Sequence, residues 1–150
     1  MPLTIQLPFA LALLLLGVPA AAQSHLGQLL DDHATLLSAE EFKRDVVGRS
    51  FVGPTPTGGT LDVLYAADGR VVGTGSAPRV PFAPTALISG TWSIDDDGRV
   101  CSTIRISSSV PPDLIFPRRC QWWFKKADQY FLSDSDWDRD AQVLLRSLKP

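Results

Sequence analysis

Short runs of β-type residues, each ending at a turn signal, follow one another from residue 49 to the end of the chain. In the run 60–65, Leu61, Val63 and Tyr65 occupy every second position, the pattern of a strand with one buried face. Asp-Gly pairs at 68–69 and 97–98 each separate two runs, which is a strong hairpin signal. The pattern predicts eight strands, at 49–52, 60–65, 71–75, 90–94, 100–106, 120–125, 129–133 and 143–148.

One short helix is predicted ahead of these strands, over residues 38–47. Ser38 can cap its N-terminus and Glu41 completes a capping box, while Gly48 ends it. Residues 23–37 form a leader of mixed character. Because no helical pattern separates the strands, we expect a mainly β domain over 38–150, a single antiparallel meander closed as a barrel or rolled into a sandwich.

The hairpin at 120–133 carries apolar residues on both faces. Trp122 and Trp123 are adjacent on one strand, as are Phe131 and Leu132 on the other, and adjacent residues of a strand point to opposite faces. The hairpin must therefore be covered on both sides. We expect the helix at 38–47 to be its outer cover.

In an antiparallel meander the connections alternate between the two ends. Tight turns at 68–69, 95–98 and 126–128 then share one end, and the long connections gather at the other, at 53–59, 76–89, 107–119 and 134–142. Loops on a rigid scaffold often hold binding residues. The end with the long connections is therefore the predicted binding site.

Aromatic and arginine side chains, which are enriched in binding interfaces, occur in these long connections. An alternative is that Phe82, Ile115 and Phe116 simply fill the end of a barrel, since small barrels have filled interiors. The residues predicted to bind a ligand or partner are Arg79, Phe82, Phe116, Arg118, Arg119 and Trp137.

The N-terminal segment has the layout of a secretory signal peptide. An apolar run at 7–18 precedes the small residues 20–22, although the first basic residue is Lys43. We expect a signal peptide over 1–22 and a periplasmic or secreted protein. The alternative, an uncleaved anchor, is disfavoured because a membrane span needs about 20 apolar residues.

Cys101 and Cys120 are the two cysteines of the chain. In an exported protein an even number of cysteines indicates a disulfide. The alternative, a reactive pair, lacks the C-x-x-C spacing typical of such sites. A bridge here would contribute about 3 kcal/mol by restricting the unfolded chain.

Charge and histidine content argue against two classes of function. With 14 basic and 16 acidic residues the net charge is -2, and a nucleic-acid binder would show a basic excess. His25 and His33 both precede the predicted barrel. Because acid–base and nucleophilic catalysis rely on positioned groups of this kind, we do not expect an enzyme.

Two patterns could bind metal ions, although we predict no metal site or cofactor. Asp134, Asp136, Asp138 and Asp140 alternate like EF-hand ligands, but Arg139 and Leu145 stand where that loop requires Gly and Glu. A turn-forming acidic loop therefore explains them better. Cleavage after residue 22 would leave Gln23-Ser24-His25 at the terminus, which could offer four nitrogens to Cu(II) or Ni(II).

The motifs Gly90-Thr91-Trp92-Ser93-Ile94 and Asp97-Gly98-Arg99-Val100-Cys101, followed by Cys120 and the aromatic hairpin, resemble a pattern in small exported proteobacterial proteins of unknown function. The helix before Val47-Gly48-Arg49-Ser50 is similar too. The resemblance implies a small lipocalin-like β-barrel with a disulfide. The insert 107–119 between the cysteines departs from it.

These observations predict a non-catalytic binding protein that takes a small apolar ligand or a partner at the loop-rich end of the barrel. The alternative is a secreted inhibitor or interaction module that presents the proline-rich loops 76–89 and 107–119. We expect no nucleic-acid partner and no membrane span after signal cleavage.

Overall fold

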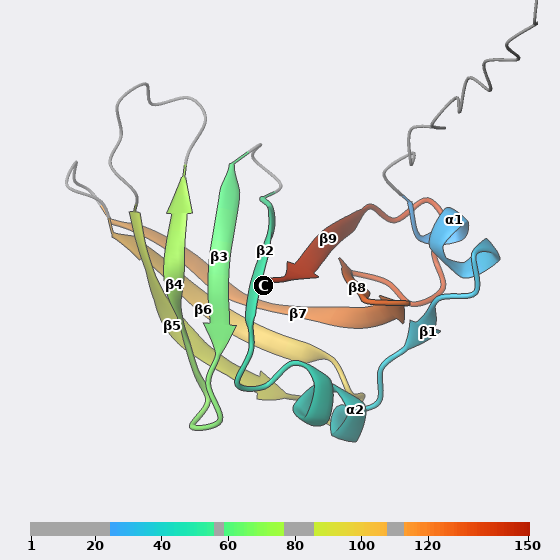
Figure 1. Ribbon diagram of the computed structural model, residues 1–150, viewed down its shortest axis with the longest axis horizontal. Coiled ribbons are helices and arrows are strands. Elements are labelled where there is room, and N and C mark those ends of the chain that lie inside the picture. The colour runs from blue at the N-terminus through green and yellow to red at the C-terminus, as the bar shows by residue number, and fades with distance from the viewer. Residues whose placement is uncertain (1–24, 56–58, 77–85, 108–112) are drawn as a thin grey trace, which may run out of the picture.

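A computed structural model describes residues 25–55, 59–76, 86–107 and 113–150, and eight of its strands form one antiparallel sheet that closes on itself (Figure 1). Each strand pairs with the next in the chain, and the last pairs with the first, so the predicted meander is a closed barrel. The strands are β2 (Ser50–Pro54), β3 (Thr60–Tyr65), β4 (Arg70–Ser76), β5 (Ala86–Ile94), β6 (Val100–Ser107), β7 (Leu114–Lys126), β8 (Gln129–Ser133) and β9 (Val143–Leu148).

The last two strands match their predicted bounds, but β7 begins six residues earlier than predicted, at Leu114 instead of Cys120. Its first half pairs with β6, so the prediction of a loop throughout 107–119 is wrong. The register shifts between Ser102 and Ile104 of β6, which leaves Pro117 and Arg118 opposite a single residue. This β-bulge accommodates the proline, which lacks the N–H group that a regular ladder would use.

One half of the barrel is filled by aromatic side chains. Phe42 lies at the centre of this cluster, with ring centroids 5.1 Å from Trp123, 5.4 Å from Trp92 and 5.9 Å from Tyr65. All these contacts are edge-to-face, the arrangement that aromatic quadrupoles favour. The buried aromatic members are Phe42, Phe51, Tyr65, Trp123 and Tyr130, and Trp92 packs against them partly buried.

Phe42 belongs to α2 (Ala39–Asp45), which lies across one end of the barrel (Figure 1). The prediction that this helix covers the outside of the 120–133 hairpin is therefore wrong. The backbone on each side of the helix is tied to a strand at that end, since the Leu37 N–H donates to Trp123 O and the Gly48 N–H to Tyr65 O, both at 2.8 Å. These two hydrogen bonds hold the helix across the opening, so its apolar side faces inward.

The outer cover of the hairpin is α1 (Leu26–Asp31), which lies in the predicted leader. Leu26 and Leu29 are completely buried against Phe124, Phe131 and Val143. The hairpin is thus covered on both faces, as predicted. A two-residue strand, β1 (Thr35–Leu36), continues from this helix and pairs with β7.

Close approach of neighbouring strands requires glycine at two interior positions. A Cβ atom on Gly73 would lie 2.0 Å from the carbonyl oxygen of Asp62, and one on Gly90 would lie 2.0 Å from that of Thr103. Glycine at such bends is a usual device for curving a sheet into a barrel. Residues 1–22, the predicted signal peptide, lie outside the described residues. In the described part of the chain no helix has the length and apolar character needed to cross a membrane.

Candidate functional site: the loop-rich end of the barrel

The two ends of the barrel differ as the alternation of connections predicts. The turns after β3, β5 and β7 lie at the end that α2 covers, and the connections after β2, β4, β6 and β8 leave from the other end (Figure 1). Of the residues predicted to bind, Arg79 and Phe82 lie outside the described residues. Phe116, Arg118 and Arg119 lie on β7, and Trp137 lies in the β8–β9 loop.

The inner wall of β2, β4 and β5 carries few side chains near this end. Gly73 pairs with Val63 and Ile88, which both belong to the interior cluster, so it faces the interior. The same register argument places three other glycines and one alanine on the inner face. The small residues that face inward toward the loop-rich end are Gly53, Gly73, Gly75 and Ala86, whereas Gly90 pairs with Val71 toward the end that α2 covers.

The wall of β6 and β7 at this end is apolar and reaches solvent. Phe116 pairs with Ile104 and Leu114 with Ile106, so both share the inner face of those isoleucines. Yet Phe116 is 44% exposed and Leu114 is 56% exposed, while Ile115 faces outward and is 62% exposed. Neither Phe116 nor Ile115 therefore fills the end of the barrel, and the filling residue, Phe42, is at the opposite end.

Arg119 and Asp134 form an ion pair beside this wall, linking β7 to the start of the β8–β9 loop. Arg119 donates from Nε to Asp134 Oδ1 at 3.0 Å and from Nη2 to Oδ2, and Gln121 donates to Oδ1 at 3.0 Å. The Arg119 hydrogen bond lowers the pKa of Asp134, outweighing the effect of burial. The three side chains border a pocket of about 280 Å³ that is lined by Arg119, Gln121, Asp134, Ala141, Gln142 and Leu144.

Arg146 of β9 lies inside the barrel and was not among the predicted site residues. It pairs with Tyr130 of the interior cluster and is only 5% exposed. Burial lowers the pKa of its guanidinium, and the nearby Tyr65 opposes this effect. The alternation of Leu144, Arg146 and Leu148 along the strand was the sequence signal for an inward-facing arginine.

The β8–β9 loop is held by turn hydrogen bonds and by α1. Ser135 Oγ accepts from the Trp137 and Asp138 N–H groups, and Arg139 donates to Asp31 at 2.6 Å. The Asp138 carboxylate accepts from the Asp140 N–H, which confirms the turn-forming role predicted for these residues. The Trp137 side chain is 80% exposed.

Metal binding finds little support in the described residues. Three potential ligands come within reach of one another only at Asp95, Cys101 and Cys120, where both sulfurs form the disulfide, and the acidic residues 134–140 form no such group. His25 is exposed and its Nδ1 lies 3.2 Å from Asp140 O. The copper site at 23–25 stays a prediction, because residues 23 and 24 lie outside the described part.

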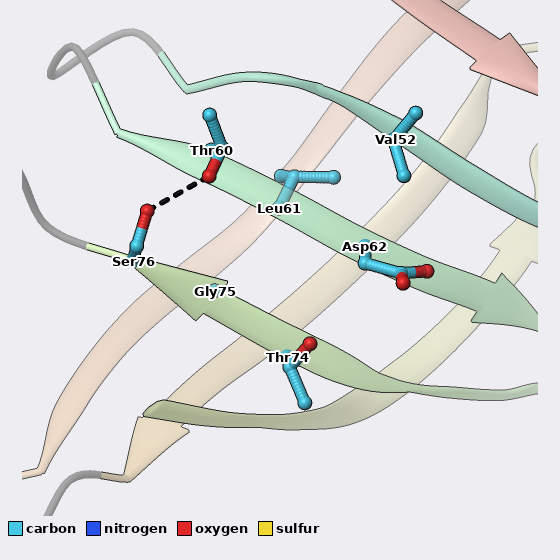
Figure 2. Close-up of a pocket in the computed structure, with 7 residues that line it drawn as sticks. All are labelled: Val52, Thr60, Leu61, Asp62, Thr74, Gly75 and Ser76. Carbon is cyan, nitrogen blue, oxygen red and sulfur yellow. Dashed lines mark hydrogen bonds between the residues drawn. The ribbon is translucent and has the colours of Figure 1, made fainter. Parts of the chain in front are cut away.

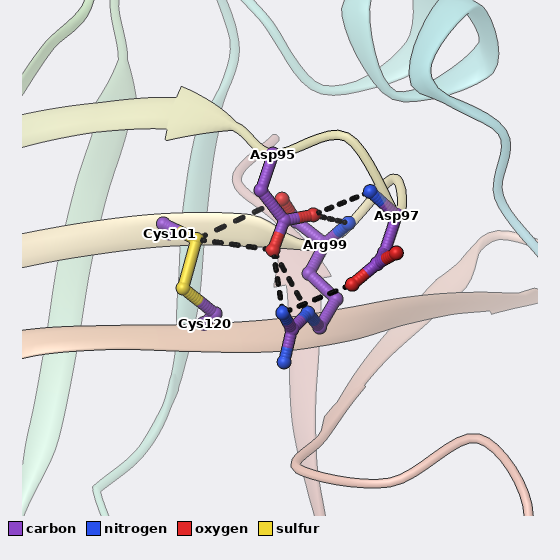
Figure 3. A network of polar contacts seen from close by, with 5 residues as sticks. All are labelled: Asp95, Asp97, Arg99, Cys101 and Cys120. Carbon is purple, nitrogen blue, oxygen red and sulfur yellow. Dashed lines mark hydrogen bonds and ion pairs between the residues drawn. A yellow bond between two sulfur atoms is a disulfide. The ribbon is translucent and has the colours of Figure 1, made fainter.

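The predicted disulfide between Cys101 and Cys120 joins directly opposed residues of β6 and β7 (Figure 3). Beside it, Asp95 Oδ1 accepts from the Arg99 N–H at 2.8 Å and Oδ2 accepts from Arg99 Nε at 2.9 Å. Burial raises the pKa of Asp95, but the hydrogen bonds and charge of Arg99 together lower it. The network confirms the predicted turn and has a structural role at the end of the barrel that α2 covers.

A second pocket, of about 290 Å³, lies on the wall of β2, β3 and β4 (Figure 2). Val52, Asp62 and Thr74 of this pocket pair with one another and so share the outer face. Asp62 is paired with Lys149, and the Thr60 and Ser76 hydroxyls hydrogen-bond each other at 2.8 Å. These polar groups already have partners, so the pocket offers no acid–base pair and no unpaired cation.

Comparison with profiles of known protein families, with curated proteins and with solved structures finds no match for this chain. The comparisons therefore assign no activity to it.

Proposed function

We propose that this protein is an exported, non-catalytic binding protein that takes a small apolar ligand in the loop-rich half of its barrel. The observation that carries the proposal is the difference between the two halves. One half is packed with aromatic rings and closed by α2, whereas the other combines side-chain-free glycines with the half-exposed inner residues Leu114 and Phe116. An apolar wall that faces inward and still reaches solvent is typical of a ligand site.

The remaining side chains support binding over catalysis. In the described residues both histidines are exposed and lie outside the barrel, and Asp134 at the mouth is held in an ion pair. The disulfide supports export, because such bonds persist mainly in oxidising compartments. The predicted signal peptide at 1–22 agrees with that location.

A second candidate function, the binding of a protein partner, is favoured by one strand edge. β7 pairs with β6 along one edge, but along its other edge only residues Trp122–Lys126 pair with β8. Among the described residues, no strand therefore lies beside that second edge of residues 114–121. A partner could add a strand there. However, Pro117, the bulge and the adjacent arginines are features that protect edges from such pairing. The ligand-binding function is therefore the stronger candidate.

Titration with the neutral apolar dye N-phenyl-1-naphthylamine tests the proposal. We expect saturable fluorescence enhancement with the oxidised protein and an affinity reduced about tenfold or more in Phe116→Asp, since a buried charge would oppose the apolar contact. Ile115→Asp, next to it on the outer face, is the matched control and should bind like the wild type. Absence of saturable binding, or equal losses in the two variants, would contradict the proposal.

A further inference from the structure

Arg146 is a buried cation that has no carboxylate partner. All 16 acidic residues of the chain lie in its described parts, and none of them forms an ion pair with Arg146. Buried arginines are normally paired, because removing an unpaired charge from water is costly. The missing negative charge must therefore come from outside the chain or be forgone at a cost in stability.

The hydrogen bonds of Arg146 leave one edge of its guanidinium unused. Nη1 donates to the carbonyl oxygens of Pro54 at 2.8 Å and Leu145 at 2.9 Å, whereas the buried Nε has no partner. Nη2 makes no hydrogen bond to a described residue. Nε and Nη2 are neighbouring donors, and such a pair matches the two oxygens of one carboxylate.

The backbone around Arg146 makes room for this side chain. The β2–β9 ladder ends at Val52, and the next inward position on β2 is Gly53. A Cβ atom there would lie 2.8 Å from Arg146 Nη1 and 2.2 Å from Leu145 O. Glycine therefore lets the guanidinium lie across β2, at the border between the aromatic half of the barrel and the loop-rich half.

Leu144 lies between Arg146 and the mouth of the barrel. Leu144 is the next inward-facing residue of β9 toward the loop-rich end, and it lines the pocket of about 280 Å³ beside Arg119 and Gln121. The inner residues Leu114 and Phe116 lie on β7, the strand to which Arg119 and Gln121 belong. A ligand with its anionic group at Arg146 would thus contact Leu144 and pass the polar side chains of this pocket before it reaches Leu114 and Phe116.

We propose that Arg146 binds the carboxylate of a single-chain amphiphile, such as a medium-chain fatty acid, whose alkyl chain lies along the inner wall toward Leu114 and Phe116. This inference rests on the proposed function and specifies its ligand class. A carboxylate fits better than a phosphate ester, because the free edge offers two donors side by side and the remaining nitrogen is already used by two carbonyl groups. The competing explanation is that Arg146 only clamps β2 to β9 where their ladder ends.

The experiment displaces N-phenyl-1-naphthylamine from the oxidised wild-type protein at pH 7.5 with decanoate or with 1-decanol, which share the same alkyl chain length. We expect decanoate to compete at concentrations about 10- to 100-fold lower than decanol, the range expected for a charged hydrogen-bonded pair. Arg146→Met should abolish this preference and Arg146→Lys should reduce it. Arg105→Met, on the outer face of β6, is the control and should retain it.

The outcomes separate this inference from the proposed function. If the dye binds saturably but decanoate and decanol compete equally in the wild type, Arg146 is a structural clamp and the inference is overturned, while the proposed function stands. If neither the dye nor the amphiphiles bind, the proposed function fails as well. Because the decanoate–decanol comparison uses the wild-type protein, it decides the question even if Arg146→Met does not fold.

Discussion

Replacing Phe42 by alanine should destabilise the protein more than replacing any exposed aromatic residue at the other end of the barrel. Phe42 is almost completely buried and contacts three aromatic rings at centroid distances of 5.1 to 5.9 Å. Phe-to-Ala changes in well-packed cores cost about 3–5 kcal/mol, because the lost contacts leave a cavity. Since a domain is stabilised by only about 5–15 kcal/mol, this loss is a large fraction of the total.

Urea denaturation followed by tryptophan fluorescence measures this free energy, and thermal unfolding followed by circular dichroism provides an independent midpoint. At about 4 °C for each kcal/mol in a domain of this size, we expect Tm to fall by about 12–20 °C. The matched control is Phe116→Ala, which removes a half-exposed ring and should cost less than about 1 kcal/mol. A cost for Phe116→Ala equal to or greater than that for Phe42→Ala would refute the assignment of α2 as the plug of the barrel.

Three further predictions concern the disulfide, acid stability and the interior glycines. Replacing Cys101 and Cys120 together by serine should lower the free energy of unfolding by about 3 kcal/mol in urea titrations. The ion pairs of Asp45 with Arg44 and Lys125 lower the pKa of its carboxyl, so its contribution to stability is complete above about pH 5 and is lost as the pH falls further. Asp45→Asn should therefore make the urea midpoint fall less steeply between pH 5 and pH 3 than it does in the wild type. An equally steep fall in the variant would count against a stabilising role of these ion pairs. Gly73→Ala should destabilise the protein by more than about 2 kcal/mol, because the added Cβ would strike a backbone carbonyl. Gly75→Ala should cost less, because the nearest atom to its added Cβ is the tip of a side chain at 3.1 Å. Thermal unfolding followed by circular dichroism compares the two variants.

Some features of the site follow from the order of the strands along the chain, and others depend on contacts between distant residues. The loop-rich end itself was predictable, because it follows from the alternation of connections in a meander. The inward direction of Phe116 was not, since it depends on the bulge at Pro117 and on pairing with β6. Arg146 shows the same limit: alternation along β9 indicates its face, but only the closed barrel shows that no carboxylate of the described residues forms an ion pair with it.

Features that depend on neighbouring residues were determined by the sequence itself. The capping box is present as predicted, with the Glu41 N–H donating to Ser38 Oγ and the Ser38 N–H donating to Glu41 Oε2 at 2.9 Å. The turn after β5 and the strands β8 and β9 also lie where the residue pattern places them. In each case the deciding interactions lie within a few residues or within one alternating run, so no distant contact is needed to specify them.

The tertiary structure decided which surface each apolar segment covers. Both helices are short and apolar on one side, and either could have been the cover of the 120–133 hairpin. Hydrogen bonds from Leu37 and Gly48 to strands at one end hold α2 there, which leaves the outer surface of the hairpin to α1. Hydrophobic burial is non-directional and does not by itself choose between apolar surfaces of similar size. Chain connectivity and hydrogen bonds between distant residues make that choice, and these exist only once the barrel has closed.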